Sequence, residues 1–247
     1  MGKKKKKTKT VSANGKPFVS ICTPTYNRRI FIPNLIKCFQ SQTYPKELME
    51  WIIIDDGEDS VEDLFKDVEC VKYFRYEEKI KLGRKRNLMH EKTKVESIVY
   101  MDDDDFYPPD RVNHAVNRLR GNPRALAVGS SVVYIYFNDL DKIFQFGPYG
   151  PMHATAGTFA FKRELLKQTK YDDEAEMAEE KQFLKNYKVP LAQLDPRKSI
   201  LCCAHQFNTF DKRKLLIKPN PHFVRETSLK PSAFIKDKEL LKFYANI

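Results

Sequence analysis

Residues 97–105 read Ser-Ile-Val-Tyr-Met-Asp-Asp-Asp-Asp, so that an apolar strand runs directly into four consecutive carboxylates. Like charges at such close spacing are unfavourable unless a cation lies among them. We therefore expect a divalent metal site where this strand ends; the alternative is a solvated acidic loop. A site built only from oxygen ligands favours Mn²⁺ or Mg²⁺ over Zn²⁺, and such ions bridge to substrate phosphates.

The blocks around this stretch alternate between strand and helix patterns. Strand-like blocks occur at residues 18–23, 50–55 and 71–75, and helix-like blocks at residues 30–42, 82–91 and 109–120. Such alternation predicts βαβ units, and hence an α/β fold with a mostly parallel central sheet and helices on both faces. After residue 124 the expected elements are long strands at 125–137 and 142–146 joined by a hairpin at Asn138-Asp139, and a charged helix at 178–186.

Polar residues follow three of the expected strands at the point where each one ends. The first strand runs into Thr-Pro-Thr-Tyr-Asn-Arg at residues 23–28, the second into Asp-Asp-Gly at 55–57, and the fourth into the acidic run. Ligands of open parallel sheets bind beyond the carboxyl ends of the strands, so these three clusters are expected along one edge. The chain lacks both the P-loop signature and the glycine fingerprint of dinucleotide-binding folds. The edge is therefore expected to hold a nucleoside diphosphate through a metal ion on its phosphates, and not through a glycine-rich loop.

Composition limits the remaining possibilities. The chain has 247 residues, enough for one large domain, and no apolar run approaches the roughly 20 residues of a membrane span. Five cysteines without a Cys-x-x-Cys pair favour a reducing, cytoplasmic setting. Much of the net charge of +11 comes from seven lysines that precede residue 17, where no acidic residue occurs. This tail, residues 1–16, is expected to be disordered and to make at most weak contact with anionic surfaces.

Taken in order, these motifs resemble the GT-A glycosyltransferases of family 2. The resemblance rests on residues 19–28, 52–57, 83–87, 100–105 and 109–111, and covers about residues 18–210. The triplet Asp102-Asp103-Asp104 is similar to the DXD signature of that family. The segments at residues 179–183 and 194–197 also resemble small glycosyltransferases of large DNA viruses, which would place the protein in a host cytoplasm.

The resemblance implies a donor site and a metal. Asp104 aligns with the metal-binding carboxylate, Asp102 would contact the ribose or a metal-bound water, and Asp103 is the variable middle position. His205 is either an additional metal ligand or a hydrogen-bonded loop residue. Asp56 would accept a hydrogen bond from the base, while Asp55 is structural. The other residues implied to contact the nucleotide or the sugar are Thr23, Pro24, Tyr26, Arg28, Arg86, Asn87 and Gly157, whereas Arg84 and Lys85 are expected in solvent.

The general base is expected at Glu180. An inverting transfer needs a carboxylate that takes the proton of the acceptor. Residues 172–180 offer six carboxylates, and the second residue of Glu179-Glu180 matches the base of the family motif, with Glu in place of Asp. The alternative is that both glutamates only favour a helix N-terminus, and Glu179 or Asp173 would take the role if Glu180 does not.

The sequence thus predicts a metal-dependent inverting glycosyltransferase that uses a nucleotide-sugar donor, with a UDP-sugar favoured, and the hydroxyl of a glycan or another molecule as acceptor. The expected domain spans residues 17–214, with a nucleotide-sugar half at 17–107 and an acceptor half at 108–214, and residues 215–247 wrap around it. One alternative is a sugar-nucleotide nucleotidyltransferase, but the glycine-rich loop of that class is missing after the first strand. Another is a nucleic-acid-binding protein, which the concentration of charge in the tail disfavours.

Overall fold

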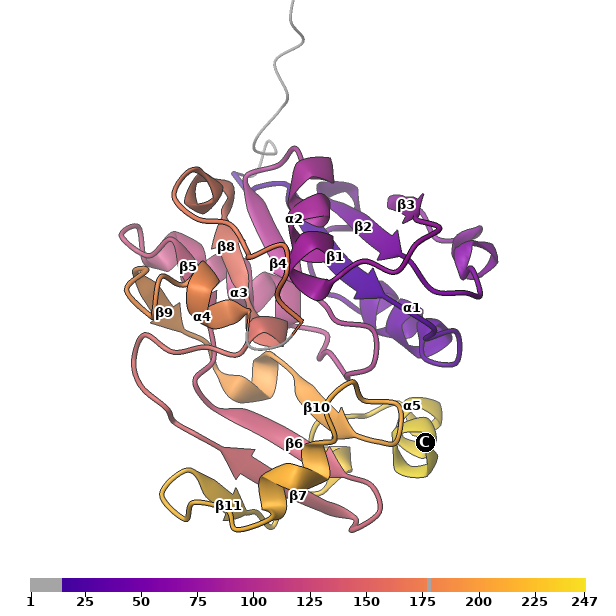
Figure 1. The fold of residues 1–247 in the computed structure, drawn as a ribbon, viewed down its shortest axis with the longest axis vertical. Helices are drawn as coiled ribbons and strands as arrows, with labels where there is room; N and C mark the ends of the chain where they lie inside the picture. Colours follow the sequence, from indigo (N-terminus) through magenta and orange to yellow (C-terminus); the bar gives the residue numbers. More distant parts are fainter. Residues whose placement is uncertain (1–14, 177–178) are drawn as a thin grey trace, which may run out of the picture.

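The computed structural model describes residues 15–176 and 179–247 of the chain. A seven-stranded sheet forms its centre, in the order β3-β2-β1-β4-β8-β5-β9, and four of its strands, β1 to β4, come from the first half of the chain (Figure 1). The strands of this sheet are β1 (Val19–Thr25), β2 (Met49–Asp55), β3 (Val71–Arg75), β4 (Ser97–Tyr100), β5 (Ala127–Gly129), β8 (Ala160–Lys162) and β9 (Leu191–Gln193). All pairs are parallel except those of β8 with β4 and β5. The mostly parallel sheet is thus confirmed.

The strand register brings the polar strand ends to one edge. Strand β1 pairs along its whole length with β2, ending in the pair of Thr25 with Asp55. On its other side Cys22 pairs with Tyr100, so the acidic run begins beside the end of β1. The loops after β1, β2 and β4 therefore lie along the same edge of the sheet, as expected for parallel strands.

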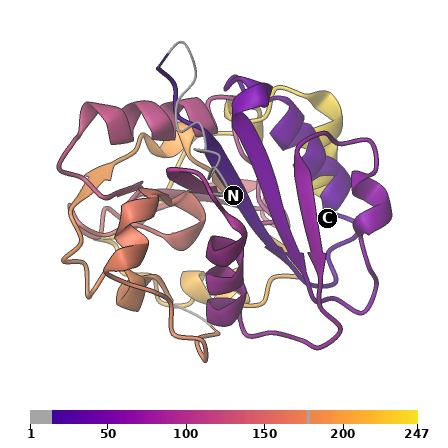
Figure 2. The ribbon, with the colours of Figure 1, turned by 90° about the horizontal axis from the view of Figure 1, so that it is seen from above.

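Helices cover both faces of the central sheet, which confirms the predicted GT-A-like arrangement (Figure 2). On one face Trp51 and Ile53 lie in the core cluster to which α1 (Ile32–Gln40) and α3 (Arg111–Gly121) contribute, with α3 over β4, β5 and β8. On the other face α2 (Leu82–Lys92) packs against Ile52 and Ile54. Successive residues of β2 thus enter opposite cores. A strand that is buried on both faces needs a continuous apolar run, which residues 51–54 provide.

A second, four-stranded sheet lies below the central one in Figure 1, in the order β10-β6-β7-β11. Its strands are β6 (Val133–Phe137), β7 (Lys142–Phe146), β10 (Leu201–Ala204) and β11 (Val224–Glu226). The hairpin between β6 and β7 is confirmed. The single strand expected at 125–137 is wrong, because β5 and β6 belong to different sheets. Between them the N–H groups of Ser130 and Ser131 bond to the side chains of Thr158 and Gln193 instead of a strand partner.

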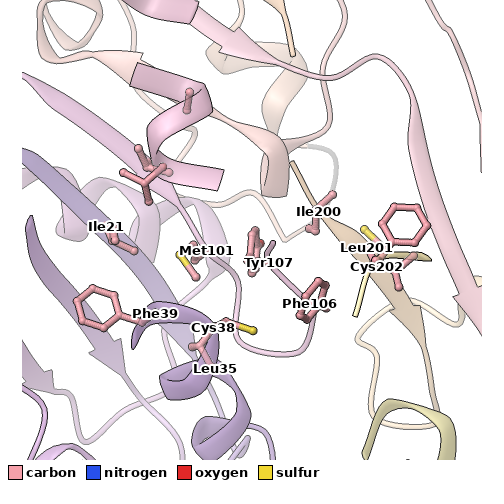
Figure 3. Packing of buried hydrophobic residues seen from close by; sticks show 14 of the residues in the cluster. Ile21, Leu35, Cys38, Phe39, Met101, Phe106, Tyr107, Ile200, Leu201 and Cys202 are labelled. Atoms are coloured by element: carbon pink, nitrogen blue, oxygen red, sulfur yellow. The ribbon is translucent and has the colours of Figure 1, made fainter. Parts of the chain in front are cut away.

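The two sheets are joined by an apolar layer that follows the acidic run. Figure 3 shows Phe106 and Tyr107 between Met101 on one side and Ile200 and Leu201 on the other. Phe106 exchanges backbone hydrogen bonds with Leu201, the first residue of β10. The acidic run is therefore held between the central sheet and the start of β10.

The remaining elements are short. The charged helix expected at 178–186 is a single turn, α4 (Glu180–Phe183), and its expected start at Ala178 lies outside the described residues. It ends early because Lys185, Asn186 and Tyr187 take left-handed backbone angles, with φ of 52°, 55° and 61°. The 3-10 helices are η1 (Lys46–Leu48), η2 (Glu62–Phe65), η3 (Ala156–Thr158), η4 (Arg163–Lys167), η5 (Pro196–Lys198), η6 (Lys212–Leu216) and η7 (Pro231–Ala233).

The last helix, α5 (Lys238–Asn246), packs back onto the domain. Asp237 caps its first turn by accepting from the N–H groups of Glu239 and Leu240. Leu240 and Tyr244 are buried, and the hydroxyl of Tyr244 donates to the carbonyl of Asp105 at 2.9 Å. The C-terminal helix thus holds the backbone of the acidic run through the bond from Tyr244 to Asp105. No helix in the described ranges has the length and apolar character needed to cross a bilayer.

Candidate active site

The four carboxylates of the acidic run point to four different partners. Asp102 accepts from Arg86 at 3.3 Å, and its backbone N–H donates to the hydroxyl of Tyr107 at 2.7 Å. Asp103 lies 3.9 Å from the guanidinium of Arg28. Arg86 belongs to α2 and Arg28 to the loop after β1, so the run is where these two parts of the chain meet.

The two later carboxylates face the segment after β10. Asp104 accepts from the amide of Asn208 at 3.1 Å and lies 3.5 Å from the imidazole of His205. Asp105 accepts from the N–H of Cys203 at 2.8 Å, and the ammonium of Lys212 lies 3.8 Å away. The solvated acidic loop is thus wrong as a description of this run, since Asp103 and Asp105 are both less than one-tenth exposed.

Because these carboxylates are crowded together, their pKa values are shifted in different directions. Burial, together with the neighbouring charge of Asp104, raises the pKa of Asp103 to about 8 and that of Asp105 to about 7. Burial also opposes ionisation of Asp104, but Lys212 and His205 outweigh it and hold the pKa of Asp104 well below its usual range. Asp104 is therefore a stronger acid than Asp103 and Asp105.

The donor set fits a hard divalent cation. Asp102 and Asp104 present oxygen atoms from side chains that are 23% and 16% exposed, so a ligand can reach them. In the described part of the chain no three His, Cys, Asp or Glu side chains converge on one point. Mg²⁺ and Mn²⁺ suit such a site, because they are commonly held by one or two carboxylates together with waters and substrate phosphates.

His205 is tied to protein atoms through both ring nitrogens. Its side chain is fully buried, Nδ1 accepts from the N–H of Phe207 at 3.2 Å, and Nε2 lies 2.9 Å from the amide of Asn208. These contacts agree with the hydrogen-bonded alternative, in which His205 positions Asp104. A role as metal ligand stays a prediction.

A buried arginine, Arg86, connects the acidic run with the glutamates at the start of α4. The Nε of Arg86 donates to Glu179 at 2.7 Å, and its Nη1 donates to Asp102 at 3.3 Å. The guanidinium also lies over the ring of Tyr100, 4.6 Å from its centroid. Burial alone would lower the pKa of Arg86, but the charges of Asp102 and Glu179 raise it well above its ordinary value. Arg86 thus fixes the acidic end of β4 relative to the start of α4.

Replacing Arg86 with methionine is expected to lower the free energy of unfolding by about 3–5 kcal/mol, because Glu179 would remain buried without its partner. Urea unfolding followed by circular dichroism measures the change. Arg84→Met is the matched control: this side chain is 43% exposed, and its loss is expected to change stability by about 0.5 kcal/mol or less. Equal effects of the two substitutions would contradict a structural role for the buried ion pair.

Glu180 follows Glu179 but differs from it in environment. Glu179 is buried against Arg86, whereas the carboxylate of Glu180 forms no ion pair or hydrogen bond with another described side chain. Burial, with the neighbouring charge of Glu179, raises the pKa of Glu180. A proton acceptor has to be free of a permanent cationic partner, so Glu180 is better suited to this task than Glu179.

The end of β1 and the loop after it supply both structural and accessible side chains. The hydroxyl of Thr23 is buried, where it donates to the carbonyl of Met101 at 2.6 Å and accepts from the indole of Trp51 at 2.9 Å. Pro24 is a buried residue of β1 that pairs with Ile54. These contacts occupy Thr23 within the sheet, and its contact with a nucleotide stays a prediction.

Tyr26 and Arg28, in the loop after β1, are less buried than Thr23 and Pro24. Lys79 lies over the ring of Tyr26, 4.5 Å from its centroid. Arg28 donates to the carbonyl of Phe207 at 2.5 Å, which ties the loop to the segment after β10. Arg28 borders the acidic run through Asp103, and Tyr26 lies two residues before it in the same loop; both remain candidates for donor contacts.

Asp55 and Asp56 have different structural roles. Asp55 accepts from the N–H groups of Gly57 and Val61, as expected for a turn residue. Asp56 accepts from the N–H of Ile80 at 2.6 Å and forms a buried ion pair with Lys85. The expectation that Lys85 lies in solvent is wrong, since its side chain is only 6% exposed. A contact of Asp56 with a base stays a prediction.

Gly157 lies directly beside the acidic run, whereas Asn87 contacts the segment that begins at Tyr171. The amide of Asn87 donates to the carbonyl of Tyr171 at 2.9 Å and accepts from its N–H at 3.0 Å. Asn87 thus ties the start of the carboxylate-rich residues 172–180 to α2. Gly157 lies at Asp102, because a Cβ at this position would stand 3.1 Å from the carboxylate of Asp102. A side chain at residue 157 would crowd that carboxylate.

Several residues of the site have no clear signal in the sequence. Lys85 differs little in its local pattern from the exposed Arg84, and Lys212 lies more than 100 residues from Asp105. Tyr107, which accepts from Asp102 and donates to the carbonyl of Gly157 at 3.3 Å, reads as an ordinary loop aromatic. Asn208 could have been found, because it lies one turn after His205.

Known structures share this fold at low sequence identity. The mannosyltransferase PcManGT of Pyrobaculum calidifontis, solved with GDP-Man and Mn²⁺, aligns with 97% of this chain and 73% of its own, at a TM-score of 0.64 and 16% identity. A fragment of TarS of S. aureus, residues 1–349 with UDP-GlcNAc, aligns with 77% of this chain at a TM-score of 0.62 and 16% identity. The alignment covers 60% of that fragment.

The sequence gives a family assignment as well. No curated protein matches the chain. The model of "Glycosyl transferase family 2" matches residues 20–175, which include β1 to β4, the acidic run and the carboxylates up to Glu174. Since this match covers more than half of the chain, and the structure has the GT-A fold, the chain belongs to glycosyl transferase family 2.

Proposed function

We propose that this chain is a metal-dependent, inverting glycosyltransferase that moves a sugar from a nucleoside-diphosphate sugar to a hydroxyl of a glycan or another acceptor. The observation that carries the proposal is the buried ion-pair chain from Asp102 through Arg86 to Glu179. It sets the carboxylates at the end of β4 and the free carboxylate of Glu180 at fixed positions on the two sides of Arg86. A transfer reaction needs these two functions, donor binding and proton acceptance, in one place.

The donor is expected at the acidic end of the sheet. Asp102 and Asp104 would hold Mn²⁺ or Mg²⁺, and the bound ion would offset the charge that develops on the departing diphosphate. Arg28 borders this position, and Gly157 leaves room beside Asp102. Tyr26, in the same loop as Arg28, is the other expected contact of the donor. TarS was solved with UDP-GlcNAc and PcManGT with GDP-Man and Mn²⁺, which supports a nucleotide sugar as donor. A UDP-sugar is our first choice of donor.

The acceptor proton is expected to pass to Glu180. The acceptor oxygen forms a bond to the anomeric carbon while the bond from that carbon to the diphosphate oxygen breaks. The proton of the acceptor hydroxyl moves to the carboxylate of Glu180, and the nucleoside diphosphate leaves with the electron pair of the broken bond. A single displacement of this kind inverts the anomeric centre. The raised pKa of Glu180 brings its basicity closer to neutral pH, which favours general-base catalysis.

The two alternative functions receive no support from the fold. The loop after β1 runs from Tyr26 to Arg29 without glycine, unlike the nucleotide-binding loop of a nucleotidyltransferase. The lysines that suggested nucleic acid lie mainly in residues 3–16, of which only residues 15 and 16 are described. Glycosyl transfer therefore remains the function that the site supports best.

A thermal-shift series tests donor class and metal dependence together. UDP-glucose, UDP-GlcNAc, UDP-galactose, GDP-mannose and a dTDP-sugar are each added with Mn²⁺ and with EDTA. A ligand at about 100 times its Kd adds about 2.7 kcal/mol, which corresponds to a Tm increase of about 5–10 °C for a chain of this size. We expect the largest shift for a UDP-sugar with Mn²⁺. Equal shifts in EDTA would contradict metal dependence, and a GDP- or dTDP-sugar that shifts Tm most would replace UDP as the donor.

A further inference from the structure

Exposed apolar side chains are concentrated in one short segment. Eight large hydrophobic side chains are exposed among the described residues, and four of them lie in residues 206–218. We call this stretch the docking segment. Its exposed apolar residues are Phe207, Phe210, Leu215 and Ile217, with exposed fractions of 41%, 42%, 37% and 70%. Such a concentration in a soluble domain marks a surface that contacts another molecule or a membrane.

Two of these exposed side chains, Leu215 and Ile217, are not needed to hold η6 in place. In η6 Leu216 packs against the main core, while its neighbours Leu215 and Ile217 face outward. Beside the segment, Phe207 lines a groove of about 550 Å³ together with Ile30 and Phe243 of α5. The apolar surface therefore continues beyond the segment.

Cations surround the apolar side chains of the docking segment. The segment contains Lys212, Arg213, Lys214 and Lys218 but only one carboxylate, Asp211. Arg213 is paired with Asp211 and Lys212 faces Asp105, whereas Lys214 and Lys218 form no ion pair with any residue in the described ranges. Exposed apolar side chains among uncompensated cations are typical of proteins that bind at the surface of anionic membranes.

We propose that the docking segment holds this protein on an anionic phospholipid surface, with Phe207, Phe210, Leu215 and Ile217 in the headgroup layer. A symmetric contact with a second copy would place like charges opposite each other, which is unfavourable. Nucleic acid would account for the cations but leaves the aliphatic Leu215 and Ile217 without a partner. A bilayer with negative headgroups matches both the charge and the apolar side chains. The proposal does not depend on the proposed function.

The docking segment is joined directly to the candidate active site. Asn208 donates to Asp104 at 3.1 Å, and Arg28 donates to the carbonyl of Phe207 at 2.5 Å. Lys212 also donates to the carbonyl of Cys203 at 2.9 Å. Docking through this segment would therefore hold the acidic run close to the membrane surface, where an acceptor carried by a lipid is within reach.

Co-sedimentation of the full chain with vesicles tests the proposal. Vesicles made of equal parts phosphatidylcholine and phosphatidylserine are compared with vesicles of phosphatidylcholine alone. We expect binding only to the anionic vesicles, and weaker binding as salt is added. In Phe210→Ser and Ile217→Ser each substitution is expected to lower the partition coefficient by about tenfold, because each removes one large apolar side chain from the lipid interface.

Matched variants separate the docking segment from other contributions. Leu140→Ser removes a side chain that is 48% exposed in the turn between β6 and β7, and it is expected to leave binding unchanged. Lys214→Ser with Lys218→Ser should weaken binding most at low salt. Thermal melting checks that each variant is folded.

Three results would overturn the proposal. The first is a native chain that does not bind anionic vesicles. The second is a Phe210→Ser, Ile217→Ser double variant that binds them as tightly as the native chain, since the lysines before residue 17 would then account for binding. The third is a native dimer, seen by sedimentation, that this double variant dissociates without any change in vesicle binding, which would assign the surface to a second copy.

Discussion

Replacing Glu180 with glutamine is expected to slow glycosyl transfer by roughly 10²–10⁴-fold, the usual effect of losing a general base. Glutamine keeps the shape of the side chain but cannot take the acceptor proton. Donor affinity is expected to change little, because the ion pairs of Arg86 are with Asp102 and Glu179 and not with Glu180. Turnover is measured as release of nucleoside diphosphate from the donor that the thermal-shift series identifies, and donor affinity as the Tm shift with that donor.

Glu179→Gln is the control for this experiment, because it changes the adjacent residue in the same way. It weakens the ion pair with Arg86 and is therefore expected to lower stability more than Glu180→Gln does. Near-normal turnover in Glu180→Gln, with a large loss in Glu179→Gln or Asp173→Asn, would move the base to that neighbour.

The pH dependence of turnover provides a second measure of the same role. A base acts only in its ionised form, so turnover should rise with pH as Glu180 loses its proton. Because burial raises the pKa of Glu180, this rise is expected at higher pH than for an exposed glutamate. The rise should be absent from the residual activity of Glu180→Gln.

Replacing Asp104 with asparagine is expected to weaken metal-dependent donor binding by more than about 100-fold, since even the loss of residues around metal ligands commonly costs 10–100-fold. Lys212 and His205 hold the pKa of Asp104 well below its usual range, and its side chain is 16% exposed, so its carboxylate is available to a cation. Titration of Mn²⁺ in the presence of a fixed concentration of donor, followed by the Tm shift, measures the change.

Asp110→Asn is the matched control for the metal site. Asp110 lies in the same loop region, where its only ion pair within residues 15–176 and 179–247 is with the exposed Lys198 at 3.3 Å. It is expected to leave Mn²⁺ dependence unchanged. If Asp104→Asn binds donor and Mn²⁺ as the native chain does while Asp102→Asn does not, Asp102 is the main ligand.

Much of the first half of the fold could be predicted from the sequence. Strand β3 was predicted at its observed bounds, and β1, β2 and β4 within one or two residues at each end. These elements carry complete local patterns: the apolar run at residues 51–54 requires burial on both faces, and turn residues such as Gly57 mark the strand ends. The parallel arrangement then follows from the helices between the strands.

The second half was harder because its strands are short and their partners are distant in the chain. Strands β5, β8 and β9 have three residues each, too few for an alternating pattern to be recognised. The break between β5 and β6 depends on Thr158 and Gln193, which lie 28 and 62 residues away from their partners. No local pattern records such bonds.

The sequence by itself determined which residue types meet at the end of β4, because four aspartates after an apolar strand specify an acidic site wherever the sheet places them. Only the tertiary structure decided which partner each carboxylate has, and therefore how acidic each one is. It buried Lys85 against Asp56, joined Arg86 to Asp102 and Glu179, and brought His205 and Lys212 to Asp104 and Asp105. The acidity of a carboxylate depends on burial and on charges within a few ångströms, and that distance is fixed by folding and not by separation along the chain.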